Sequence, residues 1–182
     1  MLEQAIGYTL GSLQLVRDAA LSRATPCASW TLRDLLAHLD DSLQALDEAV
    51  VVRRVDLTPG AGAQGPDLVA SLRRRASQMM GHWAQARGVD PVAVGDLTLP
   101  ADLVGAAGAI EVAVHGWDVA AACGAPRPIP AGLALDLLAV GRAVLDPADR
   151  AGRFAAPIET STSATPNARL LAFLGRVPYH PN

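Results

Sequence analysis

Apolar side chains recur every three or four residues along most of this chain, which is the spacing of one face of an α-helix. The pattern predicts five long helices and one short helix, over residues 2–20, 31–50, 67–88, 101–123, 130–145 and 167–174. Thr31 suits the N-cap of the second helix, and Gly124 with Pro126 suits the end of the fourth. No alternating run of apolar and polar residues predicts a strand. We therefore expect an all-α fold, built on a four-helix bundle with extra short helices near the C-terminus.

The 182 residues are about as many as one ordinary domain contains, and 51% of them are hydrophobic. Because no internal repeat is found, residues 1–182 are expected to form a single domain. The longest uncharged stretch, residues 4–16, is shorter than the ~20 residues that cross a bilayer, and no basic segment precedes it. We expect a soluble, cytoplasmic protein with no membrane contact, and the net charge of −3 speaks against a nucleic-acid partner.

Composition removes several kinds of chemistry from consideration. All 15 basic residues are arginine, which excludes a Schiff-base lysine, a pyridoxal-phosphate enzyme and a P-loop lysine. Cys27 and Cys123 belong to no CxxC pair, so we expect them to be reduced and to fill space as small apolar residues. Four histidines remain as the main candidates for acid–base or metal chemistry.

Two motifs are better explained by ordinary surface structure. Gly60, Gly62 and Gly65 spell GxGxxG, but a helix precedes them and no acidic residue follows at the distance that a dinucleotide site requires. We interpret them as a flexible loop. The consecutive arginines of residues 73–75 spread around a helix, so they predict a solvated face or a short contact with an anion.

The fourth predicted helix carries the strongest chemical signal. Between residues 103 and 123 it is apolar on all sides, which is typical of a buried helix. Yet Glu111, His115 and Asp118 fall within one stripe about 60° wide. Burying a carboxylate costs several kcal/mol unless it is paired or bound to a cation. The stripe must therefore line a metal site, a polar network or an open cleft.

Glu111 and His115 are four residues apart, so their side chains project from the same face and could bind one divalent ion. A satisfied polar pair in the core is an equal alternative at this stage. His38 lies away from the leucine stripe of the second helix, where it could border a groove lined by the fourth. Asp34 is one turn before His38 and could orient its imidazole, although capping the helix is the simpler role.

Three segments resemble blocks of the DinB-like superfamily, in the branch related to mycothiol-dependent maleylpyruvate isomerase. They are, in chain order, TPCASWTLRDLLAHL, EVAVHGWDVAAACG and LLAFLGRVP. The resemblance implies a DinB-like four-helix bundle in which His38, Glu111 and His115 hold a divalent metal, usually zinc, with nickel as another candidate. Three protein ligands leave a position open, as in catalytic zinc sites. Asp118 would line the site or fix one of the ligands.

In this branch the cosubstrate is a low-molecular-weight thiol, typically mycothiol, which a metal can activate at neutral pH. The resemblance thus implies a thiol transferase or isomerase acting on a small-molecule substrate, with no further catalytic residue assigned. Mycothiol is an actinobacterial thiol, and the arginine-only composition is typical of such high-GC genomes. Maleylpyruvate isomerase itself carries a second domain with a substrate-binding arginine. We expect none in this chain, where Arg176 is a weak candidate for that anion contact.

Two other functions fit the same residues. The first is a metal-binding or ligand-sensing bundle that sequesters its ligand without catalysis. The second is a structural bundle in which the polar residues of the fourth helix bind one another and no metal. A homodimer formed through an apolar helix face is compatible with all three functions.

Overall fold

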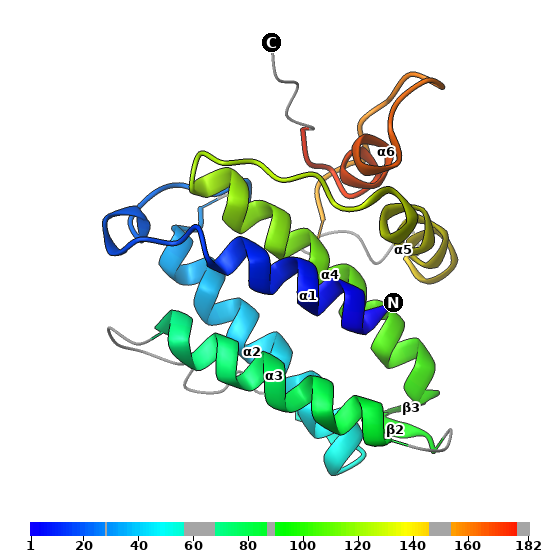
Figure 1. Cartoon of the computed structure of the whole chain (residues 1–182). Helices are drawn as coiled ribbons and strands as arrows, with labels where there is room; N and C mark the ends of the chain where they lie inside the picture. Colours follow the sequence, from blue (N-terminus) through cyan, green and yellow to red (C-terminus); the bar gives the residue numbers. More distant parts are fainter. Residues whose placement is uncertain (28, 57–67, 87–89, 146–153, 178–182) are drawn as a thin grey trace.

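The computed structural model describes residues 1–27, 29–56, 68–86, 90–145 and 154–177. Four helices form its core: α1 (Leu2–Leu13), α2 (Leu32–Val51), α3 (Leu68–Gln85) and α4 (Ala101–Ala122). Two further helices, α5 (Ala131–Val144) and α6 (Pro166–Phe173), pack on each other, and α5 also contacts α4 (Figure 1). The fold is therefore all-α in its main elements, as the apolar spacing predicts.

Helix α4 is the centre of the bundle. It contacts α1, α2 and α5, and 14 of its 22 residues are buried. Its length and composition would allow it to cross a membrane, but 72% of its most apolar stretch is buried inside the molecule. It is thus a buried core helix of the bundle, in agreement with its apolar character on all sides.

Small residues let α1 approach α4 closely. A Cβ added to Gly116 would lie 2.3 Å from Thr9 Oγ1 and 3.1 Å from Thr9 Cα, so only glycine fits this position. The Thr9 hydroxyl donates a hydrogen bond to the carbonyl of Val112, 2.7 Å away. This contact fixes α1 against the part of α4 that carries the polar stripe.

Three short strands were not predicted. They are β1 (Arg54–Val55), β2 (Val92–Val94) and β3 (Leu97–Leu99); β1 pairs with β2 in parallel, and β2 with β3 in antiparallel. Strands of two or three residues are too short for an alternating pattern to be recognised. Val55 and Val92 are buried with Ala49 and Ala101, so this small sheet covers one end of α2 and α4.

Helix α1 is shorter than the apolar spacing predicts. It ends at Leu13, and residues 18–20 form a separate 3₁₀ turn. Arg17 adopts an extended conformation that interrupts the helix, and its guanidinium donates to the free carbonyl of Gln14, 3.0 Å away. Satisfying a carbonyl in this way stabilises a helix end.

The arginine run is only partly a solvated face. Arg73 and Arg74 are exposed, but Arg75 Nε lies 2.8 Å from Oδ1 of the buried Asp40 and joins α3 to α2. The predicted glycine loop, residues 60–65, lies outside the described residues.

Candidate metal centre

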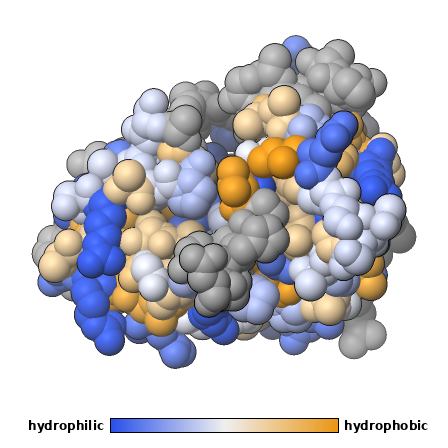
Figure 2. Space-filling model, turned by 90° about the horizontal axis from the view of Figure 1, so that it is seen from above, coloured by the Kyte–Doolittle hydropathy of each residue, from blue (hydrophilic) through white to orange (hydrophobic). Residues whose placement is uncertain are grey.

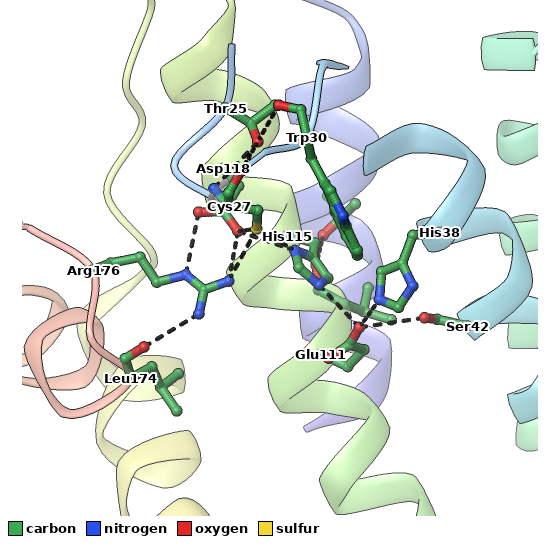
Figure 3. A network of polar contacts seen from close by, with 12 residues as sticks. Thr25, Cys27, Trp30, His38, Ser42, Glu111, His115, Asp118, Leu174 and Arg176 are labelled. Carbon is green, nitrogen blue, oxygen red and sulfur yellow. Dashed lines mark hydrogen bonds and ion pairs between the residues drawn. The ribbon is translucent and has the colours of Figure 1, made fainter. Parts of the chain in front are cut away.

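Three side chains from two helices, α4 and α2, converge on one another. Glu111 Oε1 lies 2.6 Å from His38 Nε2 and 3.0 Å from His115 Nε2 (Figure 3). One turn of α4 separates Glu111 from His115, while His38 reaches them from α2, which packs against α4. The potential ligand atoms of the three residues all lie within 4.8 Å of one another. The structure therefore brings together the three residues that the sequence singles out.

A carboxylate lies behind His115. Asp118 Oδ2 is 3.0 Å from His115 Nδ1, and the Asp118 side chain is fully buried. An ionised carboxylate only accepts hydrogen bonds, so Nδ1 must carry the proton that it donates to Asp118. When His115 loses its other proton, as binding a metal requires, its lone pair lies on Nε2, on the side of Glu111 and His38. Metal-binding histidines are commonly oriented by such a carboxylate.

Arg176 and Cys27 complete this network from outside the bundle helices. Arg176 Nη2 donates to Asp118 Oδ2 at 2.9 Å, and Cys27 Sγ donates to the same oxygen at 3.3 Å. Cys27 Sγ also accepts from Arg176 Nη2 at 3.4 Å. The expectation that Cys27 only fills apolar space is therefore wrong. Its position before the second helix, inside the TPCASW segment, was the only signal in the sequence, and no spacing connects it to α4.

Asp34 does not join this cluster. Its Oδ2 accepts hydrogen bonds from the backbone N–H and the hydroxyl of Thr31, at 2.9 and 2.6 Å, and forms a capping box with that residue. The hydroxyl and then the backbone N–H of Thr31 lower the pKa of Asp34, which is fully exposed. Its carboxylate thus caps α2 instead of orienting His38.

Burial and charge act in opposite directions on the ionisable groups of the centre. Burial alone would raise the pKa of Glu111, but the charge of His115 and hydrogen bonds from His115 and His38 outweigh it and hold the pKa well below its ordinary value. Burial likewise disfavours charged His115, yet Glu111 and Asp118 raise its pKa well above 6.5. The pKa of Asp118 is lowered, against burial, by His115 and Arg176. Without a metal, the centre is a chain of alternating charges.

The convergent atoms open into a cavity of about 910 Å³. Its polar wall includes His38, Glu111 and His115, with Ser42 donating to Glu111 Oε1 at 3.3 Å. The Trp30 ring lies over His38, with 4.8 Å between ring centroids. Most of the other wall residues are apolar: Ala45, Leu46, Val55, Val94, Val104, Ala107, Ile110, Val144, Leu145, Phe154, Ala155 and Leu174. The centre therefore lies at the polar end of a largely apolar cavity.

The donor set fits a divalent transition metal. Two imidazole nitrogens and one carboxylate oxygen are the ligands of many catalytic zinc sites, and they leave a position for water or substrate. Cys27, His115 and Asp118 form a second group of suitable atoms. There, however, the guanidinium of Arg176 already lies between Asp118 and Cys27, and its positive charge opposes a cation. The first group is the better candidate.

Apolar residues also gather near the centre of the face seen in Figure 2, with strongly hydrophilic residues toward its two sides.

Trp117 of α4 is buried in the bundle. Cys123 is half-buried against the core, where burial raises the pKa of its thiol in spite of Arg23 and Arg17.

Two comparisons with known proteins give matches over most of the chain. The family model described as "Mycothiol maleylpyruvate isomerase N-terminal domain" matches residues 2–120, a range that includes His38, Glu111, His115 and Asp118 but not Arg176. Two uncharacterized proteins of Mycobacterium tuberculosis, from strains CDC 1551 / Oshkosh and H37Rv, are each 30% identical over 167 residues, which cover 88% of this chain and 87% of theirs. Their mycobacterial source is in keeping with the actinobacterial composition of the chain. The chain belongs to the mycothiol maleylpyruvate isomerase N-terminal domain family.

Proposed function

We propose that this protein is a divalent-metal-dependent thiol transferase or isomerase that uses a low-molecular-weight thiol such as mycothiol. The observation that carries the proposal is the convergence of His38, Glu111 and His115 at the wall of a large cavity. Zinc is the metal that the two imidazoles and one carboxylate suit best, with nickel as the alternative. A divalent ion at these ligands supplies a Lewis acid that lowers the pKa of a thiol or a water at neutral pH.

The protein's own residues hold and enclose this centre. Asp118 keeps the lone pair of His115 on Nε2, and Ser42 donates to the Glu111 oxygen that faces both histidines. Trp30 covers one side of His38. These contacts restrict the ligands before any ion arrives, which lowers the cost of ordering them on binding.

The apolar walls indicate the kind of electrophile that would enter. Aliphatic and aromatic side chains line the part of the cavity beyond the histidines, so burial of an apolar group would supply most of the binding energy. In a transferase, a carbon–sulfur bond forms while the thiol proton and a leaving group depart. In an isomerase, the same bond forms and breaks again, and the thiol is released unchanged.

The test is an assay of metal-depleted and zinc-reloaded protein with mycothiol and the generic electrophile 1-chloro-2,4-dinitrobenzene. We expect thioether formation that requires zinc and that is lost in Glu111→Gln. The control variant His82→Ala, which changes a histidine exposed at the surface, should keep wild-type rates. As a check on the cavity, Ala45→Phe should raise KM for the electrophile because the added ring fills the apolar wall. Stoichiometric zinc binding without faster thioether formation from this electrophile and without isomerisation of maleylpyruvate would favour a sequestering protein and contradict the proposal.

A further inference from the structure

We propose that Arg176 is a positioning residue of the metal centre, which holds Asp118 so that this carboxylate in turn fixes His115. The inference rests on the proposed metal site. It gives Arg176 a different role from the substrate anion contact for which the sequence makes it a weak candidate, and it extends the centre to the segment after α6.

Two nitrogens of Arg176 contact the two carboxylate oxygens of Asp118. Arg176 Nη2 lies 2.9 Å from Asp118 Oδ2, and Nε lies 3.4 Å from Oδ1. The Asp118 side chain is fully buried and that of Arg176 is only 10% exposed. A guanidinium that meets both oxygens of a carboxylate fixes its plane, which a single point charge cannot do.

Arg176 makes two further hydrogen bonds within the protein. Nη1 donates to the carbonyl of Leu174 at 3.2 Å, and Nη2 donates to Cys27 Sγ at 3.4 Å. With the two bonds to Asp118, these contacts use four of the five N–H groups of the guanidinium. Arg176 lines the cavity, but its one remaining N–H leaves little capacity for a substrate anion, whereas the geometry suits a residue that holds its neighbours in place.

The consequence for the metal follows from His115. On the side of the ring away from Glu111, Nδ1 donates a hydrogen bond to Asp118 Oδ2, and that same oxygen is the one Arg176 Nη2 binds. If Arg176 is removed, the buried carboxylate loses the guanidinium that meets both of its oxygens, and only Cys27 and His115 still restrain it, both through Oδ2. The contact that directs His115 Nε2 toward Glu111 and His38 is then held less firmly.

Whether removal of Arg176 weakens or strengthens metal binding distinguishes a positioning role from a purely electrostatic one. A positive charge near a cation site opposes the cation, so deleting Arg176 should strengthen metal binding if charge alone matters. A positioning role predicts the opposite, because partners behind a ligand typically contribute 10- to 100-fold to metal affinity.

The experiment measures zinc affinity of the whole chain by competition with a chromophoric chelator, for wild type, Arg176→Met, Arg176→Lys and Arg127→Met. We expect Arg176→Met to weaken zinc binding by about 10- to 100-fold. Arg176→Lys should recover part of this loss, since an ammonium replaces the charge of the guanidinium but not its planar arrangement of N–H donors. Arg127, which is tied to Tyr8 and Ser12 away from the centre, is the matched control and should leave the affinity unchanged.

A second readout follows the imidazole itself. Long-range ¹H–¹⁵N correlation spectra of the zinc-loaded protein should show His115 protonated at Nδ1 in wild type, with this signal shifted or broadened in Arg176→Met. If Arg176→Met does not fold, Arg176→Lys decides by the same two measurements. Unchanged or tighter zinc binding, or an unchanged His115 signal, in a folded Arg176 variant overturns the inference alone. Failure of the wild type to bind zinc overturns the proposed metal site instead.

Discussion

Two histidine–carboxylate pairs in this bundle have the same separation but different surroundings. His82 Nδ1 lies 2.6 Å from Asp47 Oδ1, and His38 Nε2 lies 2.6 Å from Glu111 Oε1. The first pair joins α3 to α2 at the surface, where 46% of the His82 side chain is exposed. The second pair meets another histidine, His115, at the wall of a cavity.

The difference shows that a short ion pair does not identify a metal site. What distinguishes the second pair is the convergence of a third donor and the network behind it, in which Asp118 and Arg176 orient His115. An exposed pair contributes little to stability and orders nothing beyond itself. The two pairs therefore serve as site and control in the same molecule.

The largest contrast is expected between Glu111→Ala and Asp47→Ala. Each variant removes the carboxylate of one pair, but only Glu111 shares its oxygen with two histidines. We expect Glu111→Ala to lose zinc affinity by more than about 100-fold, beyond the range typical of a partner behind a ligand. Elemental analysis after dialysis should find one zinc ion per chain in wild type and in Asp47→Ala. Retention of that ion by Glu111→Ala would contradict the assignment.

The pH dependence of the metal-free protein should also reflect the centre. Glu111 and Asp118 have lowered pKa values, so the stability they contribute is complete above their ordinary values of 4.5 and 3.8 and is lost as pH falls. His115 has a raised pKa, so its contribution is complete below 6.5 and is lost as pH rises through the folded value.

The free energy of unfolding, measured in urea with a chelator present, should therefore be greatest between about pH 4.5 and 6.5. Glu111→Gln should flatten the acid side of this curve. A Glu111→Gln curve parallel to that of wild type below pH 4.5 would show that this carboxylate is not coupled to the histidines.

One glycine adjoins His82 of the surface pair and another adjoins His115 of the centre, and the two glycines should respond oppositely to alanine. Gly116→Ala forces a methyl group against Thr9 and should destabilise the fold by about 1–3 kcal/mol. Gly81→Ala in α3 meets nothing within 4 Å and should stabilise it by about 1 kcal/mol, the difference in helix propensity. Thermal or urea unfolding measures both. Equal effects of the two changes would mean that α1 and α4 are not packed as closely as described.

The smallest effect is expected for His82→Ala. The pair with Asp47 is exposed, and such pairs contribute about 0–1 kcal/mol to the free energy of unfolding. The variant should bind zinc like wild type. A loss of zinc from His82→Ala would place a metal ligand in the surface pair and remove the distinction between the two regions.

The sequence predicts the centre as far as local periodicity reaches. An apolar helix with Glu111, His115 and Asp118 on one stripe required a compensating structure, and in the buried α4 His115 contacts both carboxylates. His38 joins the site only because α2 and α4 pack together, and the spacing of residues along one helix does not show which helices pack together. The resemblance to the family supplied that step.

The remaining members of the site depend on tertiary contacts. Cys27 contacts Asp118 across 91 positions and Arg176 contacts it across 58, and neither lies in a periodic element. The strands escaped prediction for two reasons: β1 gains its partner from a distant segment, as when Arg54 pairs with Ala93, and β2 and β3 form a local hairpin whose strands are too short to show a period. Long-range pairing of loops leaves no period in the sequence.

X-ray diffraction from zinc-loaded crystals at the zinc absorption edge would show where the ion binds. We expect one anomalous peak per chain, bounded by His38 Nε2, Glu111 and His115 Nε2. A crystal without a peak there, or with its peak between Cys27 and Asp118 or at the His82–Asp47 pair, would contradict this expectation.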